Sequence, residues 1–127
     1  MRLHHVGIAT KSIDKAINFL RNTYDIRHVS EIIYDERQEA NLCMISLSDG
    51  SKIELISGKV VENIIKKRVN IYHACYEVEN LDFEKDKFLN SGAIIVSDKK
   101  PAVLFGGAQV CFLLTPIGLI ELLERTD

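Results

Sequence analysis

The pattern of apolar and polar residues has the same order in both halves of the chain. Residues 3–14 and residues 71–82 each begin as an apolar strand and end at the start of a helix. Ser12 and Asn80 stand where a helix N-cap is expected, and apolar residues at helical spacing follow Ser12. This order indicates an internal repeat.

An offset of 68 residues places His5 on His73 and Ile13 on Leu81. Several β-rich runs follow each predicted helix: 26–34, 41–47 and 51–57 in the first half, and 93–97, 102–105, 109–115 and 118–124 in the second. Each half therefore predicts a βαβββ module, with repeats 1–58 and 69–127 joined by a short helical linker. We expect one α+β domain in which paired βαβββ modules form a curved mixed sheet.

A glutamate lies at the centre of the last apolar run, "GLIELLE", and its burial without a partner would cost several kcal/mol. This residue, Glu121, has a repeat counterpart in Glu54 of "KIELIS", at an offset of 67. Strand alternation turns the neighbouring leucines and isoleucines toward the helix-covered core and both glutamates toward the opposite face. The same alternation lets His5 and His73 share that face, which predicts a site with two histidines and two glutamates.

Two imidazoles and two carboxylates suit a divalent ion such as nickel, cobalt, manganese, iron or zinc. The two carboxylates also neutralise the ion's charge, which lowers the cost of burying it. A single strand histidine is more often a structural residue, but four ligand-type residues share one repeat register here. By contrast, His4 faces away from His5, and we expect it at the surface or behind the metal ligands. His28 has no repeat counterpart, and we expect it to be structural or exposed.

Composition narrows the class of protein. The chain has 127 residues, 46% of them hydrophobic, and a net charge of −2, which disfavours nucleic-acid or anionic-membrane partners. We find no apolar run of membrane-spanning length and no signal-peptide pattern, and therefore expect a cytoplasmic protein. The spacing of Cys43, Cys75 and Cys111 includes no Cys-x-x-Cys motif, so we expect free, buried thiols.

The segments "HHVGIAT", "KIELIS", "YHACYEV" and "IGLIELLE" and the paired modules resemble the vicinal oxygen chelate superfamily, which includes glyoxalases, bleomycin resistance proteins and dioxygenases. The resemblance covers essentially the whole chain and is greatest to methylmalonyl-CoA epimerases, then to glyoxalase I (lactoylglutathione lyase). It implies that His5, Glu54, His73 and Glu121 bind one divalent ion, such as Co, Ni, Mn or Zn. It also implies an enzyme that moves a proton next to a carbonyl through an enolate, a substrate that is an acyl-CoA or a glutathione adduct, and a homodimer.

The same resemblance suggests which residues move the proton. In glyoxalase-like chemistry a ligand such as Glu54 or Glu121 can itself act as the base. In epimerases a separate glutamate before the third strand takes part, and here Asp35, Glu36 and Glu39 are available, with Glu36 as our catalytic candidate.

Several features differ from the epimerase pattern. Glu39-Ala40 replaces the expected Gly-Val step, Glu54 stands where glutamine is frequent, and the segment 99–124 is shorter. Coenzyme A phosphates would need nearby cations, for which Lys66-Lys67-Arg68 and Lys99-Lys100 are available, although such clusters are more often simply solvated.

Three other functions remain open from the sequence. A metal-free binding or resistance protein of the same fold would not need four ligand residues in repeat register. A thiol transferase acting on fosfomycin-like compounds would use three ligands and tolerate the loss of Glu54. A ring-cleaving dioxygenase would need redox-active iron and commonly has a doubled module.

Overall fold

The computed structural model describes residues 1–126 and shows an α+β fold, as the sequence predicts. The chain forms two compact units: unit 1 comprises Met1–His4 and the chain from His73 onward, and unit 2 comprises His5–Tyr72. The elements are β1 (Arg2–Ala9), α1 (Ile13–Thr23), β2 (Ile26–Val29), β3 (Ile33–Asp35), β4 (Ala40–Leu47), β5 (Lys52–Gly58), η1 (Lys59–Val61), α2 (Glu62–Lys66), β6 (Ile71–Val78), α3 (Leu81–Asn90), β7 (Ile94–Pro101), η2 (Val103–Phe105), β8 (Gln109–Thr115) and β9 (Gly118–Glu124).

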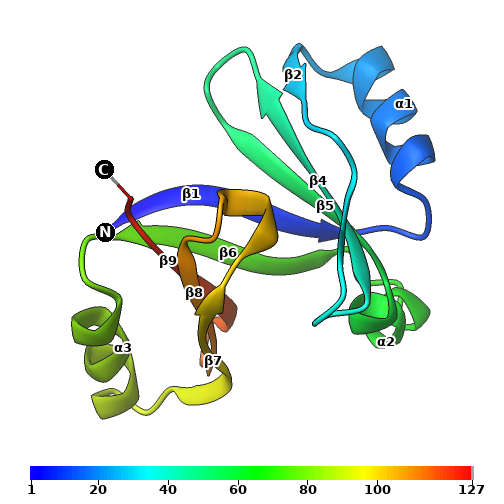
Figure 1. The fold of residues 1–127 in the computed structure, drawn as a ribbon. Coiled ribbons are helices and arrows are strands. Elements are labelled where there is room, and N and C mark those ends of the chain that lie inside the picture. Colours follow the sequence, from blue (N-terminus) through cyan, green and yellow to red (C-terminus); the bar gives the residue numbers. More distant parts are fainter. Residues whose placement is uncertain (127) are drawn as a thin grey trace. The chain divides into compact units, whose positions relative to one another are not determined.

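In unit 2 the strand order is β2-β4-β5-β1 (Figure 1). The short strand β3 pairs with β4. The pairing of β1 with β5 is parallel, whereas β4 runs antiparallel to β5. Helix α1 begins at the predicted cap, where the Ser12 hydroxyl oxygen accepts a hydrogen bond from the Lys15 backbone N–H at 3.2 Å. Its apolar face packs on one face of these strands, in a core of Ile13, Leu20, Cys43, Ile45 and Leu55.

In unit 1 the strand order is β6-β9-β8-β7, and β6 runs parallel to β9 (Figure 1). Two side chains satisfy the first N–H groups of α3. Asn80 accepts a hydrogen bond from the Phe83 N–H at 3.0 Å, and Glu124 accepts one from the Leu81 N–H at 2.8 Å. The core below this helix consists of Val78, Leu81, Cys111, Leu113, Ile120 and Leu122.

The predicted elements are confirmed with two corrections. The run 102–105 is not a strand, because Val103–Phe105 form the 3₁₀ turn η2 and Gly106 and Gly107 follow with positive φ. The run 26–34 is broken near Ser30, whose hydroxyl accepts a hydrogen bond from the Met44 N–H at 2.8 Å. The predicted helical linker is confirmed as η1 and α2. The repeat boundaries 1–58 and 69–127 within a single domain stay a prediction.

No helix among residues 1–126 is both long and apolar enough to cross a membrane.

The three cysteines are buried thiols that form no disulfide, as predicted. Burial raises the pKa of the Cys111 thiol to about 11 and also raises the pKa of the Cys43 thiol. At pH 8 roughly one Cys111 in a thousand is therefore a thiolate, the form that reacts with alkylating agents.

We expect iodoacetamide to leave Cys43 and Cys111 unmodified in the native protein and to modify both in denaturant, as read by mass spectrometry. Rapid native labelling of either one would contradict the burial described here.

A close backbone approach makes glycine necessary at Gly58. This residue has a φ of +115°, and a Cβ there would lie 2.5 Å from the Glu39 carbonyl oxygen. We expect Gly58→Ala to lower the free energy of unfolding by roughly 2–4 kcal/mol, measured by urea denaturation. The matched control is Gly50→Ala, which has a φ of +90° but open space around the added Cβ, so only the backbone cost of about 1 kcal/mol is expected. Equal losses in the two variants would contradict the steric argument.

Candidate functional site

Unit 2 brings together the first predicted histidine and glutamate. Glu54 on β5 stands opposite Gly7 of the parallel strand β1, and His5 lies two residues before Gly7 on the same face. The His5 Nε2 and Glu54 Oε1 atoms are 3.1 Å apart in a hydrogen bond. Both side chains are buried, with relative exposures of 1% for His5 and 5% for Glu54.

Unit 1 brings together the second predicted histidine and glutamate in the same way. Glu121 on β9 stands opposite Cys75 of the parallel strand β6, and His73 lies two residues before Cys75. The His73 Nε2 and Glu121 Oε1 atoms are 3.1 Å apart, and both residues are buried. The two His–Glu pairs therefore share one construction. In each pair, the histidine and the glutamate lie on neighbouring parallel strands, and the glutamate is paired with the residue two positions after the histidine.

Each pair fits the donor set of a divalent metal ion. Two ligands at right angles, each about 2.1 Å from an ion, lie about 3 Å apart. The 3.1 Å between imidazole nitrogen and carboxylate oxygen in each pair matches that spacing. The histidine and glutamate of each pair can thus serve as neighbouring ligands of an ion without a change in their separation.

Phe112 is a site residue that the sequence analysis missed. Its ring lies edge-on to the His73 imidazole, with centroids 5.3 Å apart, and it stands opposite Glu121 on β8. The equivalent position in unit 2 is Met44, which stands opposite Glu54 on β4. The repeat offset of 68 residues between Met44 and Phe112 was a signal that could have identified both as site neighbours. The buried phenyl ring thus packs against the His73 imidazole in the edge-to-face geometry that aromatic rings prefer.

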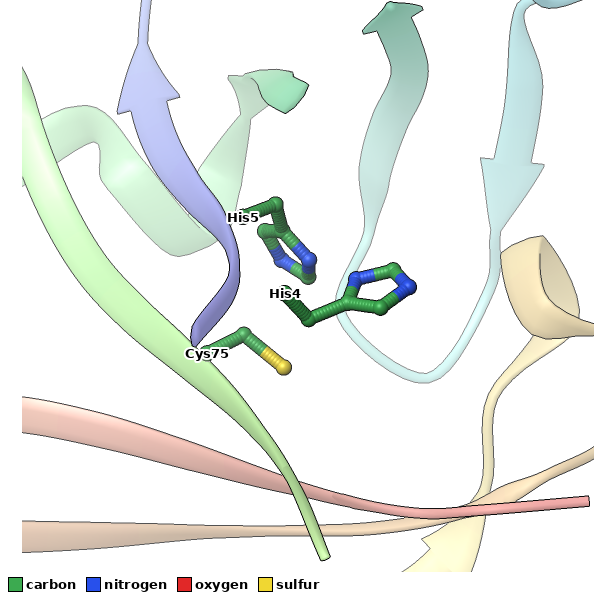
Figure 2. A group of neighbouring side chains, drawn as sticks. All are labelled: His4, His5 and Cys75. Atoms are coloured by element: carbon green, nitrogen blue, oxygen red, sulfur yellow. The ribbon is translucent and has the colours of Figure 1, made fainter. Parts of the chain in front are cut away.

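His4 is half-buried rather than fully exposed. Its ring lies edge-on to Phe105 at 5.4 Å, and its ring nitrogen lies within 4.8 Å of the Cys75 sulfur, all within unit 1. Figure 2 shows the His4 and Cys75 side chains on β1 and β6. His28 lies on β2 and is exposed, as expected.

The candidates for a separate proton carrier differ in how their carboxylates are held. Asp35 is buried, and its two oxygens accept hydrogen bonds from the Arg37 N–H at 3.0 Å and from the Gln38 amide at 2.7 Å. This carboxylate closes the turn between β3 and β4, and both of its oxygens are already hydrogen-bonded.

Glu39 and Glu36 lie in the same turn and are exposed. The Glu39 carboxylate lies 3.3 Å from the Lys59 ammonium, and its backbone has a φ of +52°, a conformation that favours glycine. This backbone accounts for the glycine that the resemblance places near Glu39. The Glu36 carboxylate makes no ion pair or hydrogen bond within residues 1–126, which leaves it available for a substrate.

The comparisons with known proteins agree with this construction. A family model described as the glyoxalase/bleomycin resistance protein/dioxygenase superfamily matches residues 4–112. An ethylmalonyl-CoA/methylmalonyl-CoA epimerase of Cereibacter sphaeroides is 28% identical over 118 residues, which cover 88% of this chain and 87% of the relative.

Two solved structures show the same fold. The crystal structure of methylmalonyl-CoA epimerase from Mycobacterium tuberculosis has a TM-score of 0.84 at 20% identity, covering 99% of this chain and 89% of that one. The Streptomyces coelicolor methylmalonyl-CoA epimerase in complex with 2-nitronate-propionyl-CoA has a TM-score of 0.75 at 22% identity, covering 100% of this chain and 96% of that one.

Proposed function

Because the chain belongs to the glyoxalase/bleomycin resistance protein/dioxygenase superfamily, we propose that it is a metal-dependent enzyme that moves a proton next to a carbonyl, most closely a methylmalonyl-CoA epimerase. The observation that carries this proposal is the identical construction of the two buried His–Glu pairs. The Cereibacter sphaeroides epimerase, similar over 88% of this chain, supports an acyl-CoA substrate.

In this proposal His5, Glu54, His73 and Glu121 together hold one divalent ion. Such an ion, when bound, supplies Lewis-acid polarisation of a carbonyl oxygen, which makes the adjacent C–H more acidic. The histidines supply neutral nitrogen donors, and the glutamates neutralise the positive charge. A net-neutral donor set is consistent with the burial of all four side chains.

The proton itself needs a carboxylate within reach of the substrate carbon. Glu54 and Glu121 are candidates because each lies on the same sheet face as the histidine beside it. Glu36 is the third candidate, since its carboxylate is exposed in the turn between β3 and β4. Phe112 packs edge-on against the His73 ring and so contributes to the wall of the site.

Isomerisation of a glutathione hemithioacetal, as in glyoxalase I, is the second candidate function. Glu54 favours this function. By the resemblance, glyoxalase I binds its metal through two histidines and two glutamates, whereas epimerases frequently have glutamine at this position. Both reactions share the enolate step and differ in the substrate.

Solvent deuterium exchange tests the proposal. We expect chelator-treated protein to incorporate deuterium into methylmalonyl-CoA only after cobalt is added, as read by mass spectrometry of the substrate. Glu121→Gln should lower the exchange rate by at least about 100-fold because it removes a ligand and a candidate base. The matched control is Glu31→Gln, an exposed glutamate that makes no side-chain ion pair in the described part of the chain.

The outcomes separate the candidates. Cobalt binding without exchange would favour the second candidate function. The same test would then be made with the hemithioacetal of methylglyoxal and glutathione as the substrate. Cobalt affinity unchanged in Glu54→Gln would favour a three-ligand thiol transferase. Oxygen consumption with a catechol would favour a dioxygenase, and absence of cobalt binding would refute the metal site.

The expected homodimer and cytoplasmic location stay predictions. Unit 1 offers apolar surface for self-association, since Ile94 and Val96 on the edge strand β7 are 64% and 58% exposed. Sedimentation equilibrium should give twice the 14.4 kDa monomer mass at micromolar concentration, and a monomer mass there would contradict the dimer.

A further inference from the structure

A cleft in unit 2 lies at the ends of the two strands that carry its His–Glu pair. Its volume is about 560 Å³, and it is lined by residues from the end of β1, the end of β5 and helix α2: Thr10, Lys11, Gly58, Glu62, Ile65 and Lys66. Because β1 and β5 are parallel, both strands run from the His–Glu pair toward this cleft. Gly58 lies four residues after Glu54 on β5, a distance of about 13 Å at 3.3 Å per residue.

The surroundings of this cleft are strongly basic in a chain that is acidic as a whole. Residues 59–68 contain four cations and one acid, while the complete chain carries −2. One of these cations, Lys59, is paired with Glu39 at 3.3 Å, which leaves Lys66, Lys67 and Arg68 as the positive charges of the segment that are unpaired within residues 1–126. Lys11 adds a further positive charge from the other wall of the cleft. The one acid in the lining, Glu62, leaves the cleft net positive.

Apart from Lys59, the cations in and beside this cleft form no ion pair with the described part of the chain. Lys11, Lys66, Lys67 and Arg68 are exposed, and none of them forms an ion pair with a described residue of the chain. In unit 1, by contrast, Lys99 of the second basic cluster lies 3.2 Å from Asp82. Of the two basic clusters in the sequence, the one at 66–68 therefore has free charge to offer an anion.

The backbone beside the cleft is firmly held, which fixes the base of the Lys11 side chain. The Thr10 N–H donates to the Ile56 carbonyl at 2.8 Å, and the Ala9 N–H donates to the Asn70 carbonyl at 2.6 Å. The Thr10 hydroxyl also receives the Ser12 N–H at 3.3 Å. On the other wall, Lys66 ends α2, and the next N–H donates back to the Asn63 and Ile64 carbonyls.

We propose that Lys11 and Lys66 bind a phosphate group of the substrate's carrier in this cleft. The proposal rests on the proposed function, in which the substrate is an acyl-CoA thioester. The reacting carbon would lie near Glu54, and the pantetheine arm, when extended, is long enough to bridge the distance from Glu54 to the cleft. Two ammonium groups at the end of that path match the charge of the nucleotide's phosphates.

Calorimetric titration with coenzyme A itself tests the proposal without turnover. We expect the double variant Lys11→Ala/Lys66→Ala to bind coenzyme A about tenfold more weakly than the unmodified protein. Pantetheine, which has no phosphate, should bind both proteins equally. Lys11→Arg/Lys66→Arg should retain the affinity because it retains the charges, and its thermal unfolding provides a check on folding. The affinity of the unmodified protein should fall with added salt, and the alanine variant should lose most of that dependence.

The matched control is Lys99→Ala/Lys100→Ala, which removes the same charge from unit 1 and should leave the affinity unchanged. Dephospho-coenzyme A identifies the phosphate: equal affinities of the two proteins for it would assign the site to the 3′-phosphate. If the tenfold difference persists, the site binds the pyrophosphate. Kinetically, the alanine variant should raise KM for methylmalonyl-CoA with kcat unchanged.

Two results would overturn the proposal. One is equal affinity of the unmodified protein and the alanine variant for coenzyme A. In that case Lys66 would have only the role of a cation that stabilises the C-terminal end of α2. The other is deuterium exchange with methylmalonyl-pantetheine together with a failure of the protein to bind coenzyme A. This result would support the proposed function and refute only the phosphate site in this cleft. Failure of exchange with either thioester would instead count against the proposed function.

Discussion

The parallel strand pairing within each unit is the constraint on which the candidate site depends. Pairing Gly7 with Glu54 and Cys75 with Glu121 places each glutamate beside the histidine two residues upstream. The strand period then sends the residues flanking each glutamate to the opposite face, where a helix covers them. The apolar core and the buried polar pair are thus two results of one register.

Much of this construction could be predicted because it follows from short-range rules and from the repeat. Strand alternation separated Glu121 from its leucine neighbours, and the helix caps Ser12 and Asn80 were readable from their side chains. The repeat offset supplied what a single module could not, namely which histidine belongs with which glutamate.

Other features depend on long-range contacts that no local pattern contains. Phe112 reaches His73 only because β8 stands in a particular register against β9. The run 102–105 has strand composition, yet Gly106 and Gly107 turn the chain before a strand can form. The use of each cation also depends on tertiary partners: Lys99 meets an aspartate, whereas Lys66 does not.

Strand β9 carries a second carboxylate whose position has a consequence for folding. Glu124 lies three residues after Glu121, so it faces the helix side of the strand, where it accepts the Leu81 N–H. A slip of β9 by one residue would turn both carboxylates to the wrong faces at once, leaving the Leu81 N–H of α3 without its carboxylate acceptor and a charge in the apolar core. Misaligned pairings of β9 are thereby penalised twice, and the strand selects its own alignment during folding.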